Sequence, residues 1–180
     1  MSGEGEARGA DDRARGVSGP GGGSDEIRRG PFVLSTDRER LDVALIHRFL
    51  SATYWAPNVT EDVVRRSIAG SLCVGVYEDG RQIAFARAVT DHATFAWIAD
   101  VFVLEPWRGR GVARWMVEAL RAHPSLAGLR RWLLATRDAH HVYEGCGFHP
   151  LARPERFMEI VTFDQGGVGV ENVPPPTERR

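Results

Sequence analysis

The sequence predicts a single α/β domain, with a β-sheet flanked by helices, between two flexible tails. The chain has 180 residues, of which 43% are hydrophobic and 26% charged, which is the balance of one globular domain. Short apolar runs typical of strands alternate with stretches of helical periodicity between residues 31 and 164. Residues 1–30 and 165–180 are rich in glycine or proline and poor in large apolar side chains, so we expect both segments to be disordered.

The domain is expected to begin with a strand and two helices. The apolar run Phe32–Leu34 predicts the strand. Thr36 and Glu39 have the spacing of a capping box, which predicts a helix continuing to about Leu50. The apolar stripe of this helix is expected to hold Leu41, Leu45 and Phe49. Thr60 predicts the start of a second helix, which buries Val64 and Ile68 and ends at Gly70.

Three strands are expected next, because the apolar period changes to that of a sheet. Leu72–Tyr77 and Ile83–Val89 flank Asp79-Gly80, a pair typical of a tight hairpin turn. A longer strand is predicted over Thr94–Leu104, the fourth strand in the order βααβββ.

The C-terminal part of the domain is expected to alternate helices and strands. It is predicted to hold a helix from about Gly111 to Ala122, a short buried strand over Trp132–Ala135, one or two helical turns over Ala139–Glu144 and a last strand over Phe157–Phe163.

The segment between the fourth strand and the next helix predicts a phosphate-binding site. Glycines at Gly109 and Gly111 let the backbone approach an anion, and the helix that follows directs its unpaired N–H groups toward the loop. No Lys-Ser/Thr follows as in a Walker loop, and Arg114 replaces the third glycine of a dinucleotide fingerprint. ATP and NAD are therefore poor candidate ligands.

Two motifs resemble the signatures of the GNAT acetyltransferases. Arg108-Gly109-Arg110-Gly111-Val112-Ala113 matches the family's pyrophosphate loop, Arg/Gln-x-x-Gly-x-Gly/Ala. Thr136–Phe148 is similar to its Asn-x-x-Ala-x-x-x-Tyr-x-x-x-Gly-Phe signature, with threonine in place of the asparagine that contacts pantetheine. The loop also follows the fourth predicted strand, where the family places it, and agreement of motif with topology is a stronger indication than either alone.

The resemblance implies the GNAT acyl-CoA N-acyltransferase fold, with a mixed central sheet flanked by helices, and transfer of an acetyl group from acetyl-CoA to a primary amine of a small molecule or peptide. Tyr143 stands where the family has its general acid, although a tyrosine that merely packs on the sheet is the alternative. A backbone N–H at about Val103, exposed by a bulge, is expected to polarise the thioester carbonyl. The implied cofactor-binding residues are Val101, Phe102, Val103, Arg108, Gly109, Arg110, Gly111, Val112 and Ala113.

The acceptor side is less closely defined by the resemblance. Asp100 is the first candidate for a general base, and a carboxylate held in a structural ion pair is an equally good interpretation. Tyr54 and Trp55 lie where the family forms part of its acceptor pocket, and both could instead belong to the edge of the core. Arg87 could bind an acceptor carboxylate, and an exposed strand arginine without such a role is the commoner case.

Several classes of function are disfavoured by the composition. The net charge is −1 and the basic residues form no block, so neither nucleic acid nor a membrane surface is an expected partner. Cys73 and Cys146 match no metal or redox spacing, so no metal is expected. Without an apolar leader or spanning segment, the expected location is cytoplasmic. The alternatives are an acyl-CoA-binding regulatory or sensor module without catalysis and a structural protein that dimerises through a sheet edge; homodimers are frequent among similar enzymes.

Overall fold

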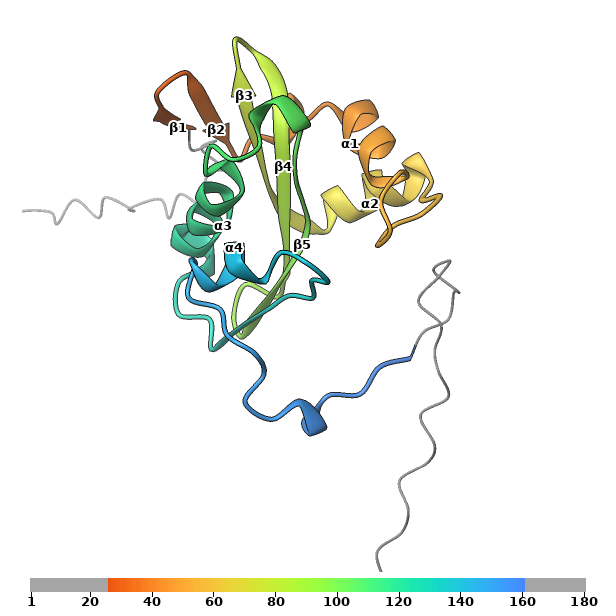
Figure 1. Cartoon of the computed structure of the whole chain (residues 1–180), viewed down its shortest axis with the longest axis vertical. Coiled ribbons are helices and arrows are strands. Elements are labelled where there is room, and N and C mark those ends of the chain that lie inside the picture. The colour runs from red at the N-terminus through yellow and green to blue at the C-terminus, as the bar shows by residue number, and fades with distance from the viewer. Residues whose placement is uncertain (1–25, 161–180) are drawn as a thin grey trace, which may run out of the picture.

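The computed structural model describes residues 26–160, which form one six-stranded sheet with helices on both faces (Figure 1). The strands are β1 (Glu26–Arg29), β2 (Phe32–Ser35), β3 (Ser71–Glu78), β4 (Arg81–Thr90), β5 (Phe95–Val103) and β6 (Arg131–Leu133). They lie side by side in sequence order, antiparallel throughout except for the parallel pair β5 and β6. The predicted α/β class and mixed sheet are confirmed.

In this part of the chain, four α-helices cover the two faces of the sheet. They are α1 (Val43–Leu50), α2 (Glu61–Ala69), α3 (Val112–Ala122) and α4 (His140–Glu144). In Figure 1, α1 and α2 lie on one side of the sheet and α3 and α4 on the other. Each side has its own core, because the side chains of the central strands alternate between the faces. Met116, Val117 and Leu120 of α3 belong to one core, and Ile46 and Leu50 of α1 to the other.

The central hairpin of β3 and β4 agrees with its prediction. Asp79 and Gly80 both have positive φ, at 49° and 77°, which is the geometry that the Asp-Gly pair permits. The second predicted helix is also confirmed: Thr60 caps α2 by accepting from the N–H of Val63 at 3.4 Å, and Val64 and Ile68 are buried.

The first predicted helix is wrong in its start and in its buried face. Asp37 caps a short 3₁₀ turn over Arg38–Arg40, and Asp42 caps α1 by accepting from the N–H of Leu45 at 2.9 Å. Because α1 starts only at Val43, its core-facing residues are Ile46 and Leu50, whereas the predicted stripe residues Leu45 and Phe49 are half-buried and Leu41 is buried ahead of the helix. Aspartates at two successive caps have overridden the threonine capping box.

The ends of the domain also differ from the prediction. Strand β1 lies within the segment predicted as a tail, and its pairing with β2 makes the glycine loop follow the fifth strand instead of the fourth. Phe157–Ile160, the start of the predicted last strand, form no strand, and Met158 and Ile160 are 99% and 90% exposed. Residues 161–163 of that strand, and the tail residues 1–25 and 165–180, lie outside the described residues. Within residues 26–160, no helix is both long and apolar enough to cross a membrane.

Candidate active site

Strands β5 and β6 pair only at one end and then part. Their parallel register joins Phe95–Trp97 to Arg131–Leu133, and β5 continues to Val103 with β4 as its partner. The N–H of Leu104 donates to the carbonyl of Ile83 in β4 at 2.9 Å. Because neighbouring residues of a strand turn their polar groups to opposite sides, the N–H and C=O of Val103 point toward the side that β6 has left.

A bulge distorts β5 next to this opening. Phe85 pairs with Phe102, whereas Arg87 pairs with Ala99, so β5 contains one residue more than β4 over this stretch. Asp100 adopts φ of 52°, a left-handed conformation that one class of bulge uses. The bulge that the family resemblance implied is therefore present.

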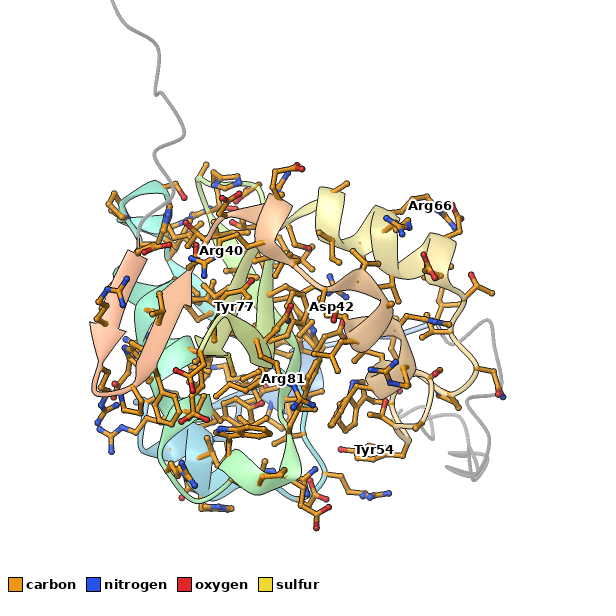
Figure 2. All side chains as sticks on the ribbon, turned by 90° about the horizontal axis from the view of Figure 1, so that it is seen from above. Arg40, Asp42, Tyr54, Arg66, Tyr77 and Arg81 are labelled. Atoms are coloured by element: carbon orange, nitrogen blue, oxygen red, sulfur yellow. The ribbon has the colours of Figure 1, made fainter. Side chains whose placement is uncertain are left out.

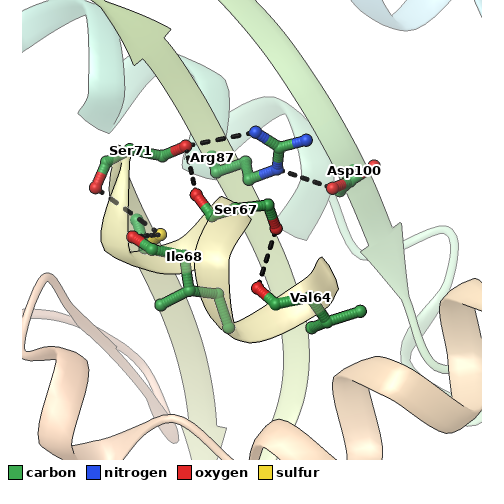
Figure 3. A network of polar contacts seen from close by, with 7 residues as sticks. Val64, Ser67, Ile68, Ser71, Arg87 and Asp100 are labelled. Atoms are coloured by element: carbon green, nitrogen blue, oxygen red, sulfur yellow. Dashed lines mark hydrogen bonds and ion pairs between the residues drawn. The ribbon is translucent and has the colours of Figure 1, made fainter. Parts of the chain in front are cut away.

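Asp100 forms a mostly buried ion pair with Arg87. The guanidinium Nε of Arg87 donates to Oδ2 of Asp100 at 2.6 Å, and the two side chains are 16% and 11% exposed. Arg87 also donates to Oγ of Ser71 at 3.1 Å, and Ser71 donates to the carbonyl of Ser67 at 2.7 Å, which ties β4 and β5 to the end of α2 (Figure 3). The predicted base and the predicted acceptor ligand thus contact each other, as in the alternative structural interpretation.

The glycine loop presents open backbone groups at the start of α3. Gly109 and Gly111 have φ of 74° and 73°, and a Cβ built on either would meet no atom within 4 Å in the described structure. Gly111 has no side chain that could cap α3, and the first N–H groups of the helix have no backbone partner among the described residues. This arrangement can bind a phosphate.

Two side chains hold the loop to the ends of β5 and β3. Nε of Arg108 donates to the carbonyl of Val103 at 3.1 Å, and the indole of Trp107 donates to Glu78 at 2.6 Å. Glu78 is a contact that the sequence did not indicate, because it lies 29 residues away in another strand. Two other predicted cofactor residues lie on opposite faces of the sheet. Val101 packs on the core on the α3 side, whereas the ring of Phe102 stacks on that of Phe49 on the α1 side, with 4.0 Å between the ring centres.

Tyr143 lies on α4, on the same face of the sheet as α3. Its ring meets that of Phe148 edge-on at 6.1 Å, and the hydroxyl of Thr136 accepts from the N–H of Ala139 at the start of α4. Burial, and next the nearby Tyr54, raise the pKa of Tyr143 to about 12. Tyr143 also lines a cavity of about 780 Å³ between β6, α4 and the segment that follows α4.

Tyr54 bridges the segment after α1 to the segment after β6. Its hydroxyl accepts from the N–H of Arg137 at 3.3 Å, and the guanidinium of Arg137 lies 3.7 Å from the centre of its ring. Figure 2 shows Tyr54 at the end of the molecule away from Arg66 of α2. Sequence reasoning missed Arg137, since nothing local relates two residues 83 positions apart.

A second cavity, of about 470 Å³, lies on the α1 face of the sheet beyond the end of β5. Its walls include Arg48, Phe49, Thr53, Trp55, Leu104 and Arg108. The cavity and Tyr143 therefore lie on opposite faces of the sheet, with the parted strands between them. No three metal-ligating side chains gather anywhere in residues 26–160.

Comparison with known proteins relates the chain to one family. The model of the acetyltransferase (GNAT) family matches residues 40–148. A protein of Gibberella zeae whose name assigns it to the acetyltransferases is 31% identical over 139 residues, which is 64% of this chain and 77% of that protein.

Solved structures of similar shape include a GNAT-family protein from Xanthomonas campestris pv. campestris. It is 50% identical, with a TM-score of 0.70 over 72% of this chain and 92% of that one. An acetyltransferase from Clostridium acetobutylicum, solved with acetyl-CoA, has a TM-score of 0.57 over 72% of this chain and 94% of that one; at 15% identity it supports the fold alone.

Proposed function

The chain belongs to the GNAT family of acetyltransferases, and on that premise we propose that it transfers an acetyl group from acetyl-CoA to a primary amine of a small molecule or peptide. One observation carries the proposal. The N–H groups at the start of α3 have no backbone partner among the described residues, and α3 follows the strand that borders the opening between β5 and β6; this supports binding of a phosphate next to an extended chain in that opening.

The backbone of the loop Arg108–Ala113 would hold the pyrophosphate of the cosubstrate. The pantetheine arm would lie along β5 as an added strand, using the backbone of Val101 and the N–H of Val103, which β6 does not pair; the carbonyl of Val103 already accepts from Arg108. The N–H of Val103 would then donate to the thioester carbonyl and stabilise the oxyanion that forms on attack.

The attacking amine must be neutral. An alkylammonium with a pKa of about 10.4 costs roughly 4–5 kcal/mol to deprotonate at pH 7, and a general base or a water chain ending in one reduces that cost. Asp100 could act as this base only by giving up its ion pair with Arg87. We therefore assign Asp100 a positioning role: it holds the bulge that turns the Val103 N–H into the opening.

Tyr143 would complete the transfer as general acid. The amine nitrogen bonds to the carbonyl carbon, the C–S bond breaks, and the thiolate of coenzyme A takes the phenolic proton; the proton lost by the amine restores Tyr143 through water. The raised pKa keeps Tyr143 protonated at neutral pH. Burial disfavours the phenolate of Tyr143 as well as the free thiolate, so the phenolic proton would have to be replaced by the amine's proton as it moves to sulfur.

Thermal unfolding with and without acetyl-CoA tests cosubstrate binding. A ligand at 100 times its Kd adds about 2.7 kcal/mol of stability, which is roughly 8 °C in Tm for a domain of this size. Gly111→Asp should abolish the shift. Gly128→Asp is the matched control, because Gly128 has φ of 80° and the same open surroundings but follows α3 instead of starting it.

Release of free thiol in the presence of primary amines, with acetylated product identified by mass, tests the transfer itself. A Tm rise without thiol release for any amine would favour the acyl-CoA-binding sensor module. An unchanged Tm at millimolar acetyl-CoA would refute the acetyltransferase proposal.

A further inference from the structure

The charge of the smaller cavity points to the class of acceptor. Two guanidinium groups, Arg48 of α1 and Arg108 of the glycine loop, line it, and none of its described lining residues is acidic. We propose that the acetyl acceptor is a primary amine that also carries an oxyanion group, a carboxylate or a phosphate, and that Arg48 binds this group. The inference rests on the acetyltransferase function proposed above.

The cavity lies where an acceptor would have to enter. Leu104, one of its walls, directly follows Val103, whose N–H is directed into the opening between β5 and β6. The cavity is on the α1 face and Tyr143 on the opposite face. An amine in the cavity would approach the carbonyl carbon from one face while the leaving thiolate meets Tyr143 on the other.

Arg48 is the better placed of the two guanidinium groups. Arg108 uses its Nε on the carbonyl of Val103, whereas the exposed guanidinium of Arg48 has no ion pair with any residue from 26 to 160. A guanidinium presents parallel N–H groups that match the two oxygens of a carboxylate or phosphate. Two positive charges in one cavity also disfavour a second ammonium, so polyamines are expected to be poor acceptors.

Aromatic side chains complete the cavity. Trp55 is 37% exposed there, and Phe49 is fixed by its stack on Phe102 at 4.0 Å. These rings can contact the carbon skeleton that joins the amine to its oxyanion group. Arg48 can thus bind the oxyanion group of such a molecule, and Trp55 can contact its carbon skeleton.

The test compares matched acceptors by release of free thiol from acetyl-CoA. The pairs are amino acids against their amides and glucosamine 6-phosphate against glucosamine, with putrescine as the cationic member. Rates are measured across pH, because an amide lowers the pKa of the neighbouring amine. We expect the anionic members to have a kcat/KM about tenfold or more above their neutral partners, since one charged hydrogen bond has about that effect.

Substitution of Arg48 links the preference to the cavity. Arg48→Gln should raise KM for the anionic acceptors about tenfold and leave KM for neutral ones and the acetyl-CoA Tm shift unchanged; Arg48→Lys should lie between. Arg66→Gln is the control, since Arg66 is exposed on α2, outside the cavity, and pairs only with Asp62 among the described residues (Figure 2). The matched pair whose anionic preference Arg48→Gln reduces more shows whether Arg48 binds a carboxylate or a phosphate.

The outcomes distinguish the proposed class of acceptor from the proposed acetyl transfer. Equal or better use of neutral or cationic amines, or a preference that Arg48→Gln leaves intact, would overturn the inference while acetyl transfer stands. Binding of acetyl-CoA without acetylation of any member of the panel would overturn both. A preference lost in Arg48→Gln and kept in Arg66→Gln supports both.

Discussion

Replacing Asp100 with asparagine removes one charge from the site and little else. Asparagine has nearly the same shape and tolerates the left-handed conformation that Asp100 adopts at φ of 52°. The change leaves the guanidinium of Arg87, 16% exposed, without its carboxylate 2.6 Å away. The variant therefore measures what the ion pair contributes to stability.

The expected loss can be worked from the burial of the pair. Removing one partner of a buried ion pair costs about 3–5 kcal/mol, and the lower end applies because both side chains keep some exposure and Arg87 retains Ser71 as a partner. A loss of about 3 kcal/mol corresponds to roughly 9 °C in Tm for a domain of this size.

Urea unfolding of Asp100→Asn, Arg87→Gln and the double variant provides the assay. The double variant should be less destabilised than the sum of the two single variants by about 2 kcal/mol, the coupling expected of neighbours in one network. Asp100→Ala should lose about 1 kcal/mol more than Asp100→Asn, because alanine is strained at positive φ.

Activity measured on the same variants shows whether Asp100 acts as a positioning residue or as the general base. A positioning residue leaves the acid limb of the pH profile of kcat/KM in place, whereas loss of the general base removes it. If Asp100→Asn costs less than about 0.5 kcal/mol, the spread seen for neutral surface changes, and yet loses the acid limb together with activity, the reasoning from the ion pair is refuted.

Two further substitutions and one labelling experiment test other parts of the structure. Tyr143→Phe should lower kcat by about 10²-fold or more and keep the acetyl-CoA Tm shift; an unchanged kcat removes the general acid. Tyr77→Phe should raise stability by about 1 kcal/mol, because the buried Tyr77 hydroxyl has no hydrogen-bond partner in the described residues. Burial raises the pKa of Tyr77 to about 12, so the folded state holds this proton more tightly than the unfolded state and stability should fall as pH rises from about 10 to 12; in urea melts at high pH, Tyr77→Phe should reduce that fall. Burial raises the pKa of the Cys73 thiol to about 11, so at pH 8 a thiol reagent should label Cys73 only after unfolding; rapid labelling of the native protein would contradict its burial.

Local chemistry made much of the fold predictable. The Asp79-Gly80 turn, the Thr60 cap and the glycines before α3 depend on backbone conformations that those residues favour by themselves, and each lies where the sequence placed it. The α/β class followed from the order of apolar periods. Gly109 and Gly111, on either side of Arg110, also located the loop that carries the proposed phosphate site, because glycines at this spacing allow the backbone conformation of such a loop.

Pairings between distant residues were decided only by the tertiary structure. Asp37 and Asp42 competed with Thr36 for the cap of the first helix, and only packing against the sheet selects among caps one turn apart. Nothing in the sequence states that Asp100 and Arg87 neutralise each other, or that Tyr54 meets Arg137. The sequence alone determined which backbone conformations were favourable at the turns and caps, because φ/ψ preferences are local. The sheet register determined which charged and aromatic side chains contact each other, because it sets which residues of neighbouring strands lie side by side.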